Sequence, residues 1–283
     1  MFTCVALGKF DGIHLGHKKI IKKTVEISKE KNLIPVAYVI DISHMLTTNN
    51  EKEELFNEYG IEKVVFEKFS DDFKNLSPKE FFSEIIIKKL MAKHIVVGTD
   101  YRFGKNREGN IDILKVLCNE NGIEFTIVDK LKIDGIEVSS TKIKEFIQSG
   151  NISDANRFLG RNYSICGNVT EGKKLGRKMG FPTVNLMSEK NIDIKSGVYV
   201  TKTHFEGKQF DSITNVGINP TVDIDEKTKI ETYIFDFSKE IYGENIKIEF
   251  LYHLRDEKKF KNIDELMRQI ASDKEKSKKY FEK

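Results

Sequence analysis

The feature that most constrains the fold of this chain is a change in the spacing of its apolar residues near residue 160. Before that point, short apolar runs alternate with segments in which apolar residues recur every three or four positions, the pattern of strands alternating with helices. Beyond it, apolar and polar residues alternate between turns rich in Gly, Asn and Asp, which is typical of antiparallel strands. We therefore expect two domains, residues 1–158 and residues 159–283.

The first domain is expected to be a doubly wound parallel sheet, because strands and helices alternate along it. A buried strand over residues 2–7 leads through a turn into a helix whose apolar residues Ile20, Ile21 and Val25 share one face. Further strands are expected over 33–40, 64–66, 95–97 and 123–128, and further helices over 51–59, 77–91, 111–121, 140–148 and 153–159.

The second domain is expected to be an antiparallel β-barrel followed by a C-terminal helix, in which Ile263, Leu266, Met267 and Ile270 recur at helical spacing. Its strands are expected over 163–169, 197–204, 209–215, 230–237 and 246–253, with a further extended segment from residue 183. The fold class is thus α/β, a parallel-sheet domain followed by an antiparallel barrel.

Charge balance and cysteine content exclude several classes of protein. The 47 Lys and Arg residues and 44 Asp and Glu residues give a formal net charge of +3, which offers no bulk reason to expect a nucleic-acid or acidic-membrane partner. Cys4, Cys118 and Cys166 lie too far apart for a zinc knuckle or a dithiol motif. No apolar run approaches the roughly 18 residues of a membrane span. We expect a cytoplasmic protein without a membrane partner, and its oligomeric state stays open.

The densest motif is the run GKFDGIHLGH, from Gly8 to His17, between the first strand and the first helix. Open α/β sheets bind ligands at the carboxyl ends of their strands, and a helix N-terminus offers free N–H groups to phosphate. His14 and His17 on the first turn can both face one phosphate and stabilise the charge that develops as pyrophosphate leaves, while Gly16 lets a ligand come close. The alternative is that the histidines only cap and pack. The strand-loop-helix context favours the phosphate site.

Two other stretches of the first domain suit a nucleotide. The loop over 98–104 is bounded by glycines and carries an aromatic pair that could receive a planar ring. The run VSSTKIK over 138–144 places hydroxyl groups, N–H groups and two lysines at the start of a helix, which suits a phosphate. Taken alone, the loop over 98–104 is better explained as a tight turn, and the run over 138–144 as an ordinary helix N-cap.

In the second domain, the run GKKLGRKMGFPTVN extends from Gly172 to Asn185. Its three glycines and four cations form a basic segment that could fold over the phosphates of ATP. Thr183 and Asn185 lie on the same side of an extended chain and offer a hydroxyl and an amide carbonyl, which are hard oxygen ligands for a phosphate-bound Mg²⁺. The alternative is a hairpin with solvated cations.

These motifs together resemble a known family. The run HLGH over 14–17, with the loops 98–104 and 138–144, resembles the nucleotidyltransferase signature of bacterial FAD synthetases, and GFPTVN over 180–185 resembles the hallmark of the riboflavin kinase module. The runs GVY at 197–199, ETYI at 231–234, YG at 242–243 and LRDE at 254–257 follow in the family's order. The resemblance implies an FMN adenylyltransferase in residues 1–158 and a riboflavin kinase in residues 159–283.

The resemblance also implies substrates and site residues. Riboflavin would be phosphorylated by ATP with Mg²⁺, and FMN would react with a second ATP to give FAD and pyrophosphate. His14 and His17 would steady the adenylyl-transfer transition state, Glu231 would deprotonate the ribityl hydroxyl, and Thr183 and Asn185 would hold Mg-ATP. Other contacts to ATP or phosphate would come from Gly8, Phe10, Gly16, Ser139, Ser140, Thr141, Lys144, Gly172, Lys174, Gly176 and Arg177, and contacts to flavin from Asp41, Asp100, Tyr101, Arg102 and Arg255. Without the resemblance, Glu231 would be interpreted as an ordinary strand-edge carboxylate.

The chain departs from the family pattern in three places. The family's Pro-His-Pro type loop reads DISH over 41–44, and Tyr233 stands where a histidine is often found. The arginines usual in the helix that begins at the Ser-Ser-Thr run are Lys142 and Lys144 here. Lysine keeps the charge but loses the bidentate fork of arginine. One alternative is therefore a riboflavin kinase with a weakened or redirected nucleotidyltransferase domain. Another is a flavin-binding regulatory or storage module, which would need no catalytic base.

Overall fold

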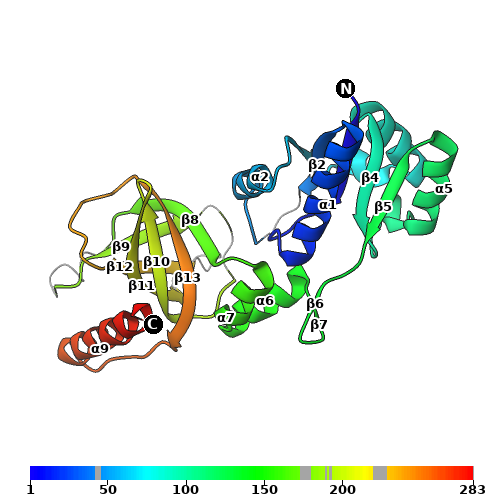
Figure 1. Ribbon diagram of the computed structural model, residues 1–283. Helices are drawn as coiled ribbons and strands as arrows, with labels where there is room; N and C mark the ends of the chain where they lie inside the picture. The colour runs from blue at the N-terminus through cyan, green and yellow to red at the C-terminus, as the bar shows by residue number, and fades with distance from the viewer. Residues whose placement is uncertain (42–45, 173–179, 189, 191–192, 219–227, 283) are drawn as a thin grey trace. The chain divides into compact units, whose positions relative to one another are not determined.

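The computed structural model describes residues 1–41, 46–172, 180–188, 190, 193–218 and 228–282. The chain forms two compact units, Met1–Ser140 and Thr141–Lys283 (Figure 1). This split lies before the boundary expected after residue 158, because α6 (Ser140–Ser149) and α7 (Ile152–Leu159) pack for the most part in the second unit.

The first unit is built on a parallel sheet of strand order β3-β2-β1-β4-β5, in which β1 (Thr3–Gly8) is central. The other strands are β2 (Ile34–Asp41), β3 (Lys63–Lys68), β4 (Ala92–Gly98) and β5 (Glu124–Val128), with a short hairpin of β6 (Lys132–Ile133) and β7 (Ile136–Glu137). The helices are α1 (Leu15–Lys31), α2 (Asn49–Glu58), α3 (Asp71–Asn75), α4 (Pro78–Glu80), the π-helix η1 (Phe81–Lys89), the 3-10 turn η2 (Lys105–Arg107) and α5 (Ile111–Asn121).

Helices cover both faces of this sheet. Successive residues of β1 point to opposite sides, so this one strand contributes side chains to both layers. Val5 and Leu7 pack with apolar side chains of η1 and α5, whereas Ala6 packs with Ile21 of α1 and Phe56 of α2. The doubly wound arrangement expected from the sequence is confirmed.

The strand order reverses between β1 and β4. From β1 the chain continues to β2 and β3 on one side of the sheet and then crosses to β4 and β5 on the other. In open α/β sheets the loops that leave two such strand ends diverge, and ligands bind between them. The run Gly8–His17 and the loop 98–104 follow these two strand ends.

The second unit is a closed antiparallel barrel of order β10-β11-β12-β9-β8-β13, as expected. Its strands are β8 (Tyr163–Thr170), β9 (Thr183–Ser188), β10 (Gly197–Phe205), β11 (Lys208–Ile218), β12 (Thr228–Ile234) and β13 (Asn245–Arg255), and α9 (Ile263–Phe281) follows. Within the described residues, no helix combines the length and apolar content needed to cross a bilayer.

Buried hydroxyl groups occupy part of the barrel interior. Thr203, Ser212, Thr201, Thr214 and Thr232 form a chain of hydrogen bonds of 2.8–2.9 Å across β10, β11 and β12. Each hydroxyl can donate one hydrogen bond and accept others, so every member of the chain has at least one partner. Successive side chains of a strand point to opposite faces. The residues that alternate with these buried hydroxyls on β11 and β12 therefore face the outside of the barrel.

Candidate active sites

The turn after β1 has a strained backbone that is held by burial. Phe10 and Ile13 adopt left-handed conformations (φ 48° and 38°) although both side chains are fully buried. The neighbouring Asp11 carboxylate accepts a hydrogen bond from the N–H of Leu46 at 2.6 Å. Non-glycine residues adopt this conformation only where the surroundings enforce it, and such strain concentrates at functional sites. No local sequence pattern marks Asp11 as the anchor of this turn.

His14 and His17 are brought together at the start of α1. His14 is the N-cap, and its Nδ1 accepts a hydrogen bond from the N–H of His17 at 3.3 Å. The two rings stack with centroids 3.6 Å apart, and Phe10 packs edge-on against His17 at 5.2 Å. In a neutral His14 ring, an accepting Nδ1 leaves the proton on Nε2, which is then a donor.

Close packing accounts for two of the three glycines of this motif. A Cβ atom on Gly16 would lie 3.2 Å from the His14 ring, and one on Gly8 would lie 3.1 Å from the Phe10 ring. Any side chain at Gly16 would therefore press on the histidine pair.

The start of α6 is tied to the same turn. The Ser140 hydroxyl donates to the carbonyl of Asp11 at 2.8 Å, and Ser139 beside it is half-buried. Thr141 is exposed and Lys144 is half-buried on α6, and both belong to the second unit.

The residues expected to contact flavin in the first unit lie at or after strand ends. Asp100 follows β4 and forms an ion pair of 3.2 Å with Lys130. Tyr101 stacks on Phe103 with centroids 5.6 Å apart and packs against the sheet core, where burial raises the pKa of its hydroxyl. Arg102 is exposed. Asp41 is half-buried at the end of β2, and residues 42–45 that follow it lie outside the described part of the chain.

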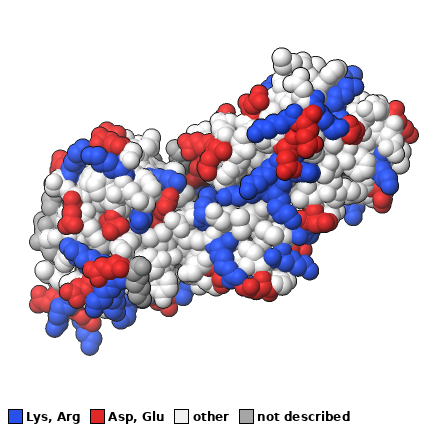
Figure 2. Space-filling view, viewed as in Figure 1, with Lys and Arg blue, Asp and Glu red and all other residues white. Residues whose placement is uncertain are grey.

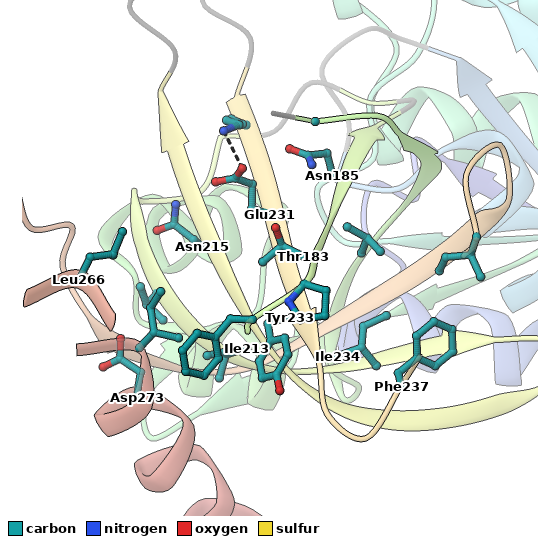
Figure 3. Close-up of a pocket in the computed structure, with 18 of the residues that line it drawn as sticks. Thr183, Asn185, Ile213, Asn215, Glu231, Tyr233, Ile234, Phe237, Leu266 and Asp273 are labelled. Carbon is teal, nitrogen blue, oxygen red and sulfur yellow. Dashed lines mark ion pairs between the residues drawn. The ribbon is translucent and has the colours of Figure 1, made fainter. Parts of the chain in front are cut away.

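The second unit contains a cavity of about 590 Å³ on the outer side of the barrel, between β9, β11, β12 and α9 (Figure 3). Strand register places Asn185 directly opposite Glu231, and Asn215 directly opposite Glu231 on the other side. Thr183 lies opposite Tyr233, two residues along the same strand pair. Three strands therefore present polar side chains to one cavity.

Glu231 is held by a cation on its own strand. Lys229 Nζ lies 2.7 Å from a Glu231 oxygen, and the Glu231 side chain is 30% exposed (Figure 3). A Cβ atom on Gly172 would overlap the Asn185 amide at 2.1 Å, so glycine is needed for the close approach of these residues. Lys174, Gly176 and Arg177 lie outside the described residues.

Arg255 lines the cavity, but most of its hydrogen bonds go to Asp273, which belongs to none of the sequence motifs. Its Nε and Nη2 donate to the Asp273 carboxylate at 2.8–3.1 Å. Asp273 lies on the apolar stripe of α9 with Leu266 and Ile270. A charged residue on the buried stripe of an amphipathic helix is a signal that could have identified it. Asn215 was also missed, because it belongs to no motif.

Two family models together cover almost the whole chain. Residues 2–142 match the FAD synthetase family and residues 159–281 match the riboflavin kinase family. Within the described residues, no group of three or more His, Cys, Asp or Glu side chains could hold a metal ion.

Full-length relatives have the same two parts. The chain is 35% identical to the bifunctional riboflavin kinase/FMN adenylyltransferase of Buchnera aphidicola subsp. Schizaphis graminum, covering 99% of this chain and 94% of that protein. It is 36% identical to the protein of the same name in Bacillus subtilis, covering 99% and 92%. A crystal structure from Streptococcus pneumoniae, titled a macrolide-efflux protein, superposes with a TM-score of 0.89 at 30% identity over 98% of this chain and 94% of that one. The chain belongs to the bifunctional riboflavin kinase/FMN adenylyltransferase family.

Proposed function

We propose that the two reactions of this bifunctional riboflavin kinase and FMN adenylyltransferase occur at separate sites. FMN would form in the barrel, and FAD would form at the turn after β1. We also propose that the functional boundary lies near residue 158, as the sequence predicts. The observation that carries this proposal is the register that sets Glu231 between Asn185 and Asn215 on the wall of its own cavity.

In the kinase reaction, Glu231 accepts the proton of the ribityl hydroxyl while that oxygen attacks the γ-phosphorus of ATP and ADP departs. The Lys229 ammonium 2.7 Å away provides a counter-charge for the carboxylate before it takes the proton. Phe260, Leu266 and Ile270 give the cavity an apolar side that suits the flavin ring.

Thr183 and Asn185 fit a phosphate-bound Mg²⁺. They lie two positions apart on β9, both line the cavity, and both carry hard oxygen donors. Both ligands are neutral, which suits an Mg²⁺ ion whose charge is already balanced by the ATP phosphates. The bound ion would neutralise charge on the transferred phosphoryl group. Gly172, Lys174, Gly176 and Arg177 would contact the ATP phosphates from the adjoining basic segment.

In the adenylyl transfer, a phosphate oxygen of FMN attacks the α-phosphorus of ATP, and the bond to pyrophosphate breaks. His14 and His17 donate to the oxygens on which charge develops, and the N-terminus of α1 adds its N–H groups. We assign Gly8, Phe10, Gly16, Ser139, Ser140, Thr141 and Lys144 to ATP, and Asp41, Asp100, Tyr101 and Arg102 to the flavin of FMN. The family resemblance places Arg255 near the flavin of the kinase reaction instead.

A second candidate is a riboflavin kinase whose adenylyltransferase unit is weakened. It is favoured by Lys142, which already pairs with Glu145 at 2.8 Å and lies over the Phe146 ring at 5.0 Å. A lysine engaged within its own helix offers less to a phosphate than an arginine would.

One experiment tests the assignment. Purified protein is incubated with riboflavin, ATP and Mg²⁺, and the products are separated by chromatography. Formation of both FMN and FAD is expected. Formation of FMN without FAD, also when FMN is supplied, would support the second candidate instead.

We further place the protein in the cytoplasm, without a nucleic-acid or membrane partner. Burial raises the pKa of the Cys4 thiol to about 11 and that of the Cys118 thiol to about 12, so both resist the oxidation that a thiolate undergoes. Acidic and basic side chains occur side by side on the face shown in Figure 2. Such mixing does not favour a polyanionic partner.

A further inference from the structure

The helix α9 forms one wall of the barrel cavity and carries a carboxylate on its buried side. Leu266, Ile270 and Asp273 line the cavity from this helix, opposite the strand residues Asn215 and Glu231 (Figure 3). Asp273 is 1% exposed. Burying a carboxylate costs free energy unless the group is paired and hydrogen-bonded. The partner of Asp273 therefore helps to determine where the helix packs.

Arg255, at the end of β13, is that partner. Its Nε lies 3.1 and 2.9 Å from the two oxygens of Asp273, and its Nη2 lies 2.8 Å from Oδ2. This bidentate geometry is the strongest form of a protein ion pair. Gln269, one turn earlier on α9, donates to Oδ1 at 2.8 Å and completes the hydrogen bonding of the carboxylate.

The remaining contacts of Arg255 also position it within the protein. Its Nη1 donates to the carbonyl of Asp256 at 2.9 Å, and its guanidinium lies over the Phe260 ring at 6.0 Å. Of the five N–H donors of arginine, at least three are therefore used by the protein itself. The guanidinium fixes a barrel strand, the segment after it and α9 relative to one another.

We propose that the Arg255–Asp273 ion pair is a positioning device that holds α9 as the wall of the riboflavin pocket, and that Asp273 governs riboflavin affinity without contacting the reacting atoms. This inference rests on the proposed riboflavin kinase function of the barrel. It changes the role of Arg255 from a direct flavin ligand to a residue that acts through α9.

The test compares two substitutions on the same helix in the full-length chain. Asp273→Asn keeps the size of the side chain and removes the charge of the pair, whereas Asp264→Asn removes the same charge at an exposed position near the start of α9. Riboflavin affinity is measured by quenching of flavin fluorescence. Because a hydrogen bond to a charged group is lost, Asp273→Asn should raise the riboflavin Kd and KM by roughly 10- to 100-fold with kcat within about threefold. Asp264→Asn should leave the riboflavin Kd and KM unchanged.

A double-mutant cycle separates positioning from direct flavin binding. If Arg255 acts through Asp273, Arg255→Lys combined with Asp273→Asn should weaken riboflavin binding no more than the stronger single substitution. Additive effects would show that Arg255 binds flavin itself and would overturn the proposal. Arg255→Lys, which keeps the positive charge, also serves as the milder variant if Asp273→Asn fails to fold.

Other outcomes are equally decisive. An unchanged riboflavin Kd in a folded Asp273→Asn protein that still makes FMN would overturn the positioning role alone. A fall in kcat and melting temperature with an unchanged KM would assign the pair a merely structural role. If the unsubstituted protein makes no FMN, the proposed kinase function fails instead.

Discussion

The two candidate sites are constructed in opposite ways. In the first unit, the site is centred on a short contiguous turn whose shape depends on the backbone conformation of Phe10 and Ile13 and on the stacking of His14 upon His17. In the barrel, the site consists of side chains from separate strands and one helix, and its shape depends on strand register. The first site should therefore be sensitive to small changes in one loop, whereas the second should be sensitive to single functional groups on rigid strands.

The largest effect is expected for Glu231→Gln. The amide keeps the shape of the side chain but cannot accept the ribityl proton, so the kinase rate should fall by roughly a hundredfold to ten-thousandfold. Steady-state kinetics measure the FMN rate, and FAD formation from supplied FMN should be unchanged. Glu244→Gln, at an exposed position beside β13, is the matched control for loss of charge. A kinase rate within a few-fold of the unsubstituted protein would eliminate Glu231 as the base.

The next effect is expected for His17→Ala. Loss of one donor to the developing charge should lower FAD formation by about a hundredfold to a thousandfold, while FMN formation stays near its original rate. Both rates are measured on the same preparation. An equal fall in both activities would indicate misfolding and would remove the support for a phosphate-facing histidine pair.

A smaller effect on the same site is expected for Gly16→Ala. The added methyl group would lie 3.2 Å from the His14 ring and should displace it by a few tenths of an ångström. Because misplacement of about 1 Å can cost a hundredfold in rate, we expect a fall of about tenfold in FAD formation and none in FMN formation. An unaffected FAD rate would show that the position of the histidine pair is not critical.

The smallest effect concerns the division between the units. Asn156 on α7 donates to the carbonyl of Phe250 at 2.8 Å and accepts from the N–H of Tyr163 at 2.7 Å. Asn156→Ala should lower the free energy of unfolding of the barrel unit by about 1–3 kcal/mol, because backbone groups lose their partners. Urea unfolding monitored by riboflavin binding measures this, with the exposed Asn57→Ala as the control. No change in stability would show that these two hydrogen bonds contribute nothing measurable to the barrel unit.

The fold was largely predictable from the sequence, because apolar periodicity differs between helices and strands. The alternation of the first unit and the period of two in the second predicted the parallel sheet and the barrel. The short helix Asp71–Asn75 and the hairpin of Lys132–Ile133 and Ile136–Glu137 were not predicted, since elements of two to five residues show no measurable periodicity.

The predictability of the sites follows their construction. The histidine turn is contiguous, so sequence spacing and its place between a strand and a helix identify it. Its anchor between Asp11 and Leu46 links residues 35 positions apart, which local patterns do not indicate. In the barrel, Glu231 was singled out by family resemblance alone, and Asp273 was missed, because strand register and helix packing determine both positions.

A mixing experiment decides whether the two reactions use independent sites. Glu231→Gln and His17→Ala are incubated with riboflavin, ATP and Mg²⁺, first separately and then together, and FMN and FAD are quantified by chromatography. If the sites are independent, Glu231→Gln alone should form little of either product, and His17→Ala alone should accumulate FMN. The mixture should form FAD, because FMN released by the His17→Ala variant is adenylylated by the Glu231→Gln variant. A mixture that forms no FAD, although His17→Ala accumulates FMN, would show that the sites are not independent.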